Sequence, residues 1–185
     1  MWHKHGDMRA RQSHQSRRPR PPLDEVALKA LALAYVARFA TSRRKCAQYL
    51  ARKLHERGWA GERQAPTAEI VERLAEAGYI DDPAYAVSKA RTLGSRGYGE
   101  RRVAVALRVA GIEEQDGAQA RDLARDGASE AAIRFARRKR IGPFATSPPD
   151  RRDSDKALAA MLRAGHPFEL AKQVLALPRD FDSDV

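Results

Sequence analysis

The chain has 185 residues and a formal net charge of +11, and charged residues make up 32% of it. A composition this polar excludes one large apolar core, and the recurrence of Ala, Leu, Arg and Glu, which all favour helices, points to a series of small helical units. The positive surplus suits a polyanion or an acidic protein surface as partner, although it would also keep a soluble basic protein from aggregating.

Residues 1–22 are predicted to form a disordered basic tail. They carry six Lys and Arg side chains against Asp7 alone, and they contain too few apolar residues to fold. Three histidines in this tail would bind a metal only weakly. An organellar transit peptide has a similar composition, but this segment lacks an amphipathic stretch. At the other end, residues 179–185 are expected to form a short acidic tail.

Helix signals follow one another along the rest of the chain. Asp24, Ser42 and Thr67 can each cap a helix. Asp82 followed by Pro83 is a further start signal, because proline favours the first helical position. Apolar residues recur at helical spacing after these starts. Later helices are expected near 100–110, 115–125, 129–140, 152–164 and 168–177, with a linker rich in Gly and Pro at 142–149.

Residues 103–109 could form either a buried strand or a helix. Their apolar pattern, VAVALRV, fits both. No second strand-like run is present to pair with them, and unpaired buried backbone groups are costly. We therefore predict a helix here.

An internal repeat is the most informative feature. A leucine or methionine precedes a helix-ending glycine, with three residues between them, at Gly58, Gly111 and Gly165, and these glycines are 53 and 54 residues apart. One such pattern is common at helix ends, whereas three at nearly equal spacing indicate three units. Each unit alone buries too little apolar surface, so neighbouring units must stack. The prediction is an all-α fold of tandem three-helix repeats in an elongated array, with repeats at 23–78, 79–126 and 127–178.

Neither enzymatic chemistry nor a membrane segment is expected. Cys46, the only cysteine, lies on the apolar stripe of its predicted helix, which favours a structural role over a nucleophilic one. Asp81 and Asp82 could contribute to a metal site, but helix capping explains Asp82, and no third ligand lies at a fitting interval. No Gly-rich phosphate loop and no secretory or membrane-spanning apolar stretch is present. We expect a cytoplasmic protein without metal or cofactor.

Since no enzymatic or membrane role is expected, the clusters of Lys and Arg are the remaining candidates for a functional surface. Arg43 and Arg44 begin a predicted helix, where the helix dipole disfavours cations, so a bound phosphate or an acidic side chain is needed to explain them. The cations at 137–140 instead suit a helix C-terminus and could simply be solvated there. For aromatic residues such as Tyr85 and Tyr98, core packing between repeats explains their placement better than base stacking does.

Several stretches resemble the RecX family of regulatory proteins. Residues 78–86, GYIDDPAYA, look like the most characteristic part of that family, and residues 96–102, RGYGERR, are similar to the segment that follows it. Shorter matches lie at the Ser42 helix start, at 136–144 and at 162–168. The resemblance covers roughly residues 24–177.

The resemblance implies both a shape and a function. RecX proteins are curved arrays of three-helix repeats that lodge in the groove of the RecA filament on single-stranded DNA and suppress strand exchange, ATP turnover and coprotease activity. The resemblance therefore implies a monomeric regulator whose partners are the RecA filament and single-stranded DNA, with double-stranded DNA as a further candidate. The contact residues that we expect are Arg96, Arg101, Arg102, Arg137, Arg138, Lys139 and Arg140. The alternative is a sequence-independent DNA-binding or transcription-regulating helical protein.

Overall fold

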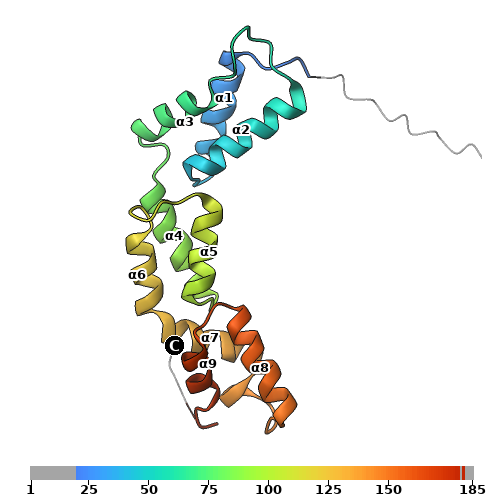
Figure 1. Cartoon of the computed structure of the whole chain (residues 1–185), viewed down its shortest axis with the longest axis vertical. Coiled ribbons are helices and arrows are strands. Elements are labelled where there is room, and N and C mark those ends of the chain that lie inside the picture. Colours follow the sequence, from blue (N-terminus) through green and yellow to red (C-terminus); the bar gives the residue numbers. More distant parts are fainter. Residues whose placement is uncertain (1–19, 180, 182–185) are drawn as a thin grey trace, which may run out of the picture.

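The computed structural model describes residues 20–179 and 181. Within these residues the chain forms nine α-helices, one 3-10 helix and no β-strand, and the helices follow one another in a long, curved array (Figure 1). The all-α prediction is confirmed. No helix in this part of the chain is long and apolar enough to cross a bilayer.

The helices form three groups of three along the long axis of the array (Figure 1). In chain order they are α1 (Glu25–Val36), α2 (Arg43–Arg57), α3 (Thr67–Glu76), α4 (Asp82–Ser95), α5 (Glu100–Ala110), α6 (Ala118–Asp126), α7 (Ala128–Lys139), α8 (Arg151–Arg163) and α9 (Phe168–Leu175). The 3-10 helix η1 (Gly142–Phe144) lies in the predicted linker between α7 and α8. Residues 103–109 belong to α5, so the helical interpretation of this segment is confirmed.

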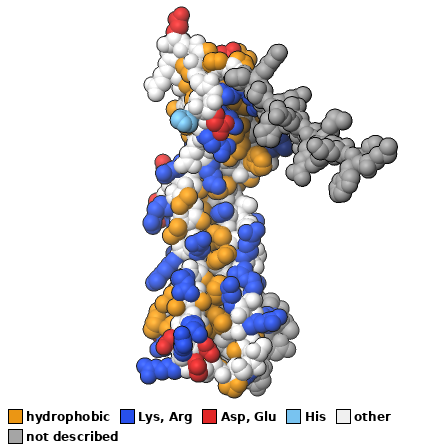
Figure 2. Space-filling model, turned by 90° about the vertical axis from the view of Figure 1, so that its right-hand side faces the viewer, with side chains coloured by type: hydrophobic (Ala, Val, Ile, Leu, Met, Phe, Trp, Pro, Cys, Tyr) orange, Lys and Arg blue, Asp and Glu red, His pale blue; other side chains and the backbone are white. Residues whose placement is uncertain are grey.

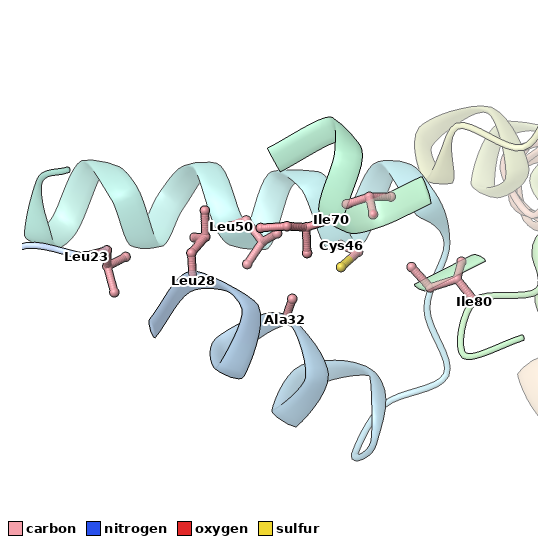
Figure 3. Packing of buried hydrophobic residues seen from close by; sticks show 8 residues of the cluster. Leu23, Leu28, Ala32, Cys46, Leu50, Ile70 and Ile80 are labelled. Atoms are coloured by element: carbon pink, nitrogen blue, oxygen red, sulfur yellow. The ribbon is translucent and has the colours of Figure 1, made fainter. Parts of the chain in front are cut away.

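Each group of three helices encloses its own small hydrophobic cluster. In the first group, Leu28 of α1 packs with Cys46 of α2 and Ile70 of α3 (Figure 3). The second cluster contains Leu107 of α5, and the third contains Met161 of α8, and both of these side chains are fully buried. Clusters of this size gain stability when neighbouring units stack, as expected for a repeat protein.

The structure confirms two of the predicted helix-capping residues and contradicts two others. Asp24 and Ser42 cap α1 and α2, and each accepts a hydrogen bond from the N–H three residues on, at 2.8 and 3.3 Å. The prediction for Asp82 is wrong, because Asp81 caps α4 through its Oδ1 at 2.8 Å. Thr67 begins α3 without a side-chain cap. Two adjacent aspartates fit the same capping pattern, and the second is engaged by another element of the fold, as described below.

The described ends of both predicted tails contact the helical array. The Pro21 carbonyl accepts hydrogen bonds from Nε and Nη2 of Arg57 at 3.0 and 2.8 Å. Arg179 donates to the Ala145 carbonyl at 2.7 Å. Residues 1–19, 180 and 182–185 lie outside the described residues, so the disorder expected there stays a prediction, as do the boundaries assigned to the repeats.

The three glycines of the sequence repeat end equivalent helices. Gly58, Gly111 and Gly165 follow α2, α5 and α8, which are the second helices of their groups, and all three have positive φ. This left-handed conformation is open to glycine without the steric cost that a Cβ imposes. The sequence pattern therefore marks the same structural position in each group.

These second helices lie end to end along one side of the array and run in the same direction (Figure 1). At the start of α2, Ser42 Oγ donates to the Ala110 carbonyl of α5 at 2.6 Å. At the start of α5, Gly99 N donates to the Ala164 carbonyl beyond α8 at 3.0 Å. The positive end of each helix dipole thus meets the negative end of the next helix. We call this row of helices the α2–α5–α8 column.

The close approach at the α5–α8 junction predicts a large effect of Gly99→Ala. A Cβ at Gly99 would collide with the backbone of Gly165 and His166, so we expect the free energy of unfolding to fall by about 1–3 kcal/mol, as in overpacked cores. The matched control is Gly94→Ala in α4, where nothing lies within 4 Å, and it should raise the free energy of unfolding by about 0.5–1 kcal/mol. Urea titration followed by circular dichroism measures both, and a similar response of the two variants would contradict the close contact.

Candidate functional site

The cations at the start of α2 are explained by partners within the protein. Arg43 N donates to Asp82 Oδ1 at 3.0 Å and Arg43 Nη1 to Oδ2 at 3.2 Å, while Arg43 Nε lies 3.4 Å from Glu72 Oε2. Partial burial lowers the pKa of Arg43, but the hydrogen bond to Asp82 and the charge of Glu72 outweigh it and raise the pKa overall. Arg44 lies across Gly111 at the end of α5, where the helix dipole favours a cation. No bound phosphate is needed to explain Arg43.

The junction between α5 and α8 is built from glycines and one buried histidine. His166 is fully buried, its Nε2 lies 3.1 Å from the Gly97 carbonyl, and its Nδ1 is buried without a hydrogen-bond partner. The ring packs against Phe135 with 5.7 Å between the ring centroids. Burial lowers the pKa of His166, although the hydrogen bond to Gly97 acts in the opposite direction. A neutral imidazole therefore occupies this junction at neutral pH.

Tyr98 brings together two of the predicted contact arginines. Its half-buried ring packs on the third hydrophobic cluster, and the Cζ atoms of Arg102 and Arg138 lie 5.8 and 5.5 Å from the ring centroid. Arg138 also lies 5.5 Å from the ring centroid of Phe135. Arg102 belongs to α5 and Arg138 to α7, so guanidinium groups from two different helix groups meet at one ring. We call Tyr98, Arg102 and Arg138 the Tyr98 cluster.

The other five predicted residues lie apart from the Tyr98 cluster. Arg101 lines a shallow hollow with two arginines of α6, and the Arg137 guanidinium lies over the phenylalanine ring of η1 at 5.2 Å. Lys139 and Arg140 border a hollow between the 142–149 linker and α8. Arg96 is exposed at the C-terminus of α4. The structure thus unites two of the seven residues and distributes the rest over the neighbouring surface.

The side of the array that carries the α2–α5–α8 column is strongly cationic. Figure 2 shows Lys and Arg side chains along its length, with hydrophobic patches between them and few acidic side chains over its middle part. On α5 the exposed apolar residues are Val105 and Val109, which are 47% and 64% exposed. A surface of this kind suits a polyanion or an acidic protein partner.

Sequence reasoning missed the aromatic rings on which cations rest. The sequence predicts core packing for Tyr98, and its half-buried ring does pack on the third cluster, but the ring also holds two arginines. The spacing of Tyr98 and Arg102 within RGYGERR carries a local signal for this contact. Arg138 is 40 residues from Tyr98 and gives no such signal. At the other junction, Lys45 lies 5.5 Å from the Tyr85 ring centroid.

The described residues show no arrangement suited to metal or thiol chemistry. No three His, Cys, Asp or Glu side chains in this part of the chain lie close enough to hold a metal ion. Cys46 is fully buried, and burial raises the pKa of its thiol. A buried thiol with a raised pKa is inert, in agreement with the structural role predicted for it.

Sequence comparison finds similar proteins among bacterial regulators. The regulatory protein RecX of Myxococcus xanthus (strain DK1622) is 34% identical over 167 residues, which cover 86% of this chain and 89% of that protein. The regulatory protein RecX of Agrobacterium fabrum (strain C58 / ATCC 33970) is 29% identical over 106 residues, which cover 57% of this chain and 56% of that protein. No protein-family model matches the chain.

Solved RecX structures share the fold. The crystal structure of RecX from Lactobacillus salivarius superposes with a TM-score of 0.63 at 19% identity, covering 81% of this chain and 93% of that one. A second crystal structure of regulatory protein RecX gives a TM-score of 0.60 at 22% identity, covering 81% of this chain and 72% of that one. At these identities the likeness shows the fold alone.

We expect His166 to make stability depend on pH. Its pKa in the folded chain lies below the ordinary value of 6.5, so below that pH the unfolded chain takes up a proton that the folded chain does not. The stabilisation is complete above pH 6.5 and is lost as the pH falls through the lowered pKa of the folded state. Urea titrations between about pH 8 and pH 5 measure it. His166→Gln, which does not titrate, is the control, and identical pH profiles for the two proteins would contradict this assignment.

Proposed function

Because this chain belongs to the RecX family of regulatory proteins, which are non-enzymatic inhibitors of RecA, we propose that it binds RecA filaments on single-stranded DNA. The proposed contact surface is the cationic side of the α2–α5–α8 column together with the adjoining C-terminal ends of α4 and α7. In this proposal the protein acts as a monomer in the cytoplasm and needs no cofactor. Double-stranded DNA is a further candidate partner.

The observation that carries the proposal is the column itself. Helices α2, α5 and α8 continue one another in the same direction, so the array presents cations along a long side rather than in a pocket (Figures 1 and 2). A nucleoprotein filament is an extended polyanion, and each phosphate that is neutralised releases counterions. Several weak contacts along one rigid array gain affinity through effective concentration. Such an array can therefore span neighbouring RecA subunits.

Inhibition follows if the bound array favours one filament geometry. A ligand shifts a conformational equilibrium only through its different affinity for the two states. Because its end-to-end helix contacts fix the curvature of the array, the array fits one spacing of RecA sites better than another. By favouring that spacing, the protein would oppose the changes that the ATP cycle of RecA requires.

The candidate contact residues can be ranked by what the structure places around them. Arg102 and Arg138 share the Tyr98 ring, and Arg137 lies over η1, so charge reversal there would disturb packing as well as binding. Arg96, Lys139 and Arg140 are exposed and can be neutralised with little effect on the hydrophobic clusters. We propose all of these, together with Arg101, as contacts with RecA or DNA.

The proposal predicts that Arg96→Gln/Lys139→Gln/Arg140→Gln weakens inhibition of the DNA-dependent ATP hydrolysis of RecA about tenfold or more, because three cations of the contact surface are lost. The assay uses the protein below the amount that would coat the DNA. The matched control removes three cations elsewhere, with Arg63→Gln, Arg73→Gln and Lys89→Gln, and should inhibit as the unmodified chain does.

The same assay separates the alternative, a sequence-independent DNA-binding protein. Inhibition at substoichiometric amounts supports a filament regulator, whereas inhibition only when the DNA is coated supports the generic binder. An equal loss of inhibition in the triple variant and its control would mean that total charge, not the proposed contact surface, determines the effect.

A further inference from the structure

Among the residues that the structure describes, the two positive charges of the Tyr98 cluster have no counterion. Neither Arg102 nor Arg138 forms an ion pair or donates a side-chain hydrogen bond within residues 20–179. Both guanidinium groups lie within 6 Å of the Tyr98 ring centroid, so two positive charges are held at one aromatic ring. By contrast, Arg134 of the same helix α7 pairs with the carboxylate of Glu130, one helical turn away, at 3.0 Å.

The aromatic rings explain how two like charges are kept together. A guanidinium is attracted to the face of an aromatic ring by the ring quadrupole, and Tyr98 is fixed in place by the third hydrophobic cluster. Arg138 is held further by the Phe135 ring at 5.5 Å. Stacking restricts both side chains, and no acceptor within residues 20–179 takes their N–H groups, which is the arrangement of a preformed anion site.

We propose that the Tyr98 cluster is a binding site for one phosphate group, whose oxygens accept hydrogen bonds from both Arg102 and Arg138. Phosphate oxygens point in tetrahedral directions and can accept hydrogen bonds from two guanidinium groups that belong to different helices. The inference rests on the proposed function, since the phosphate that we assign belongs to the backbone of the filament's single-stranded DNA.

A phosphate bound here would bridge two groups of helices. Arg102 lies in α5 and Arg138 in α7, on opposite sides of the α5–α8 junction where Gly99 contacts the Ala164 carbonyl. One phosphate can contact both arginines only when this junction holds their two helices together. Phosphate binding therefore stabilises one arrangement of the second and third groups, which links DNA contact to the shape of the array.

The test measures the binding of a fluorescent oligothymidylate to the full chain by anisotropy over a range of salt concentrations. Arg102→Gln/Arg138→Gln should lower the affinity about tenfold and reduce the steepness of the salt dependence by about one phosphate contact. Because one phosphate needs both arginines, each single variant should lose most of what the double variant loses. The control Arg63→Gln/Arg73→Gln removes two exposed cations that lie outside the α2–α5–α8 column. The site is overturned if the affinity losses of the two single variants multiply to give the loss of the double variant. It is also overturned if the double variant loses no more affinity than the control.

Substitution of Tyr98 tests its role as a positioning residue. Tyr98→Phe keeps the ring face and should leave affinity for the oligothymidylate within about twofold of the unmodified chain. Tyr98→Leu removes the ring and should weaken binding as much as the loss of one arginine, with the helical circular dichroism signal retained. Equal affinities of the Phe and Leu variants would contradict the role of the ring, and the arginine variants remain informative if the Leu variant unfolds.

Competition identifies the anion. Inorganic phosphate should displace the oligothymidylate from the unmodified chain more effectively than from Arg102→Gln/Arg138→Gln at equal ionic strength. Polyglutamate should show no such difference between the two proteins. If polyglutamate shows the difference and phosphate does not, the site takes protein carboxylates and the phosphate assignment is wrong.

The ATPase assay on the same variants separates this site from the proposed function. If the double variant loses oligothymidylate binding but still inhibits RecA fully, the phosphate site stands and the DNA contribution to inhibition is overturned. If oligothymidylate binding is unchanged while inhibition is lost, the phosphate site is overturned and the filament contact stands.

Discussion

The array depends on the contact between the end of one helix and the start of the next. At both junctions of the α2–α5–α8 column, groups that an isolated helix leaves unpaired find partners in the neighbouring helix, as Gly99 N does with the Ala164 carbonyl. The dipoles of successive helices are then aligned head to tail. Without these contacts the three hydrophobic clusters would be separate small cores, each too small to be stable alone.

The two junctions use different chemistry for the same geometry. Between α2 and α5, Arg43 is held by Asp82 and Glu72, so charge pairing supports the contact. Between α5 and α8 the contact is supported instead by the close backbone approach at Gly99 and by the buried neutral side chain of His166. At the second junction two exposed arginines lie over Tyr98, and neither forms an ion pair with a carboxylate of residues 20–179. The site that we propose for phosphate thus lies at the junction where no ion pair between described residues supports the contact.

The sequence predicts the helices and their repeat well, because the signals are local. Gly58, Gly111 and Gly165 mark equivalent helix ends, and Asp24 and Ser42 mark helix starts. The choice between Asp81 and Asp82 as a cap could not be predicted, since it depends on Arg43 from a distant segment. The same limit applies to the site, where the pairing of Arg102 with Arg138 at one ring requires the stacking of two helix groups.

The separation of the hydrophobic core into three clusters has a consequence for how the protein loses structure. Residues of the first cluster, which spans Leu23 to Ile80, do not share a common core with Met161 in the third. Loss of order at one end therefore need not carry the other end with it, and opening proceeds from the outer groups inward, as in other linear repeat proteins. A protease would accordingly cleave first within an outer group and leave the two remaining groups, which still stack on each other, as one fragment.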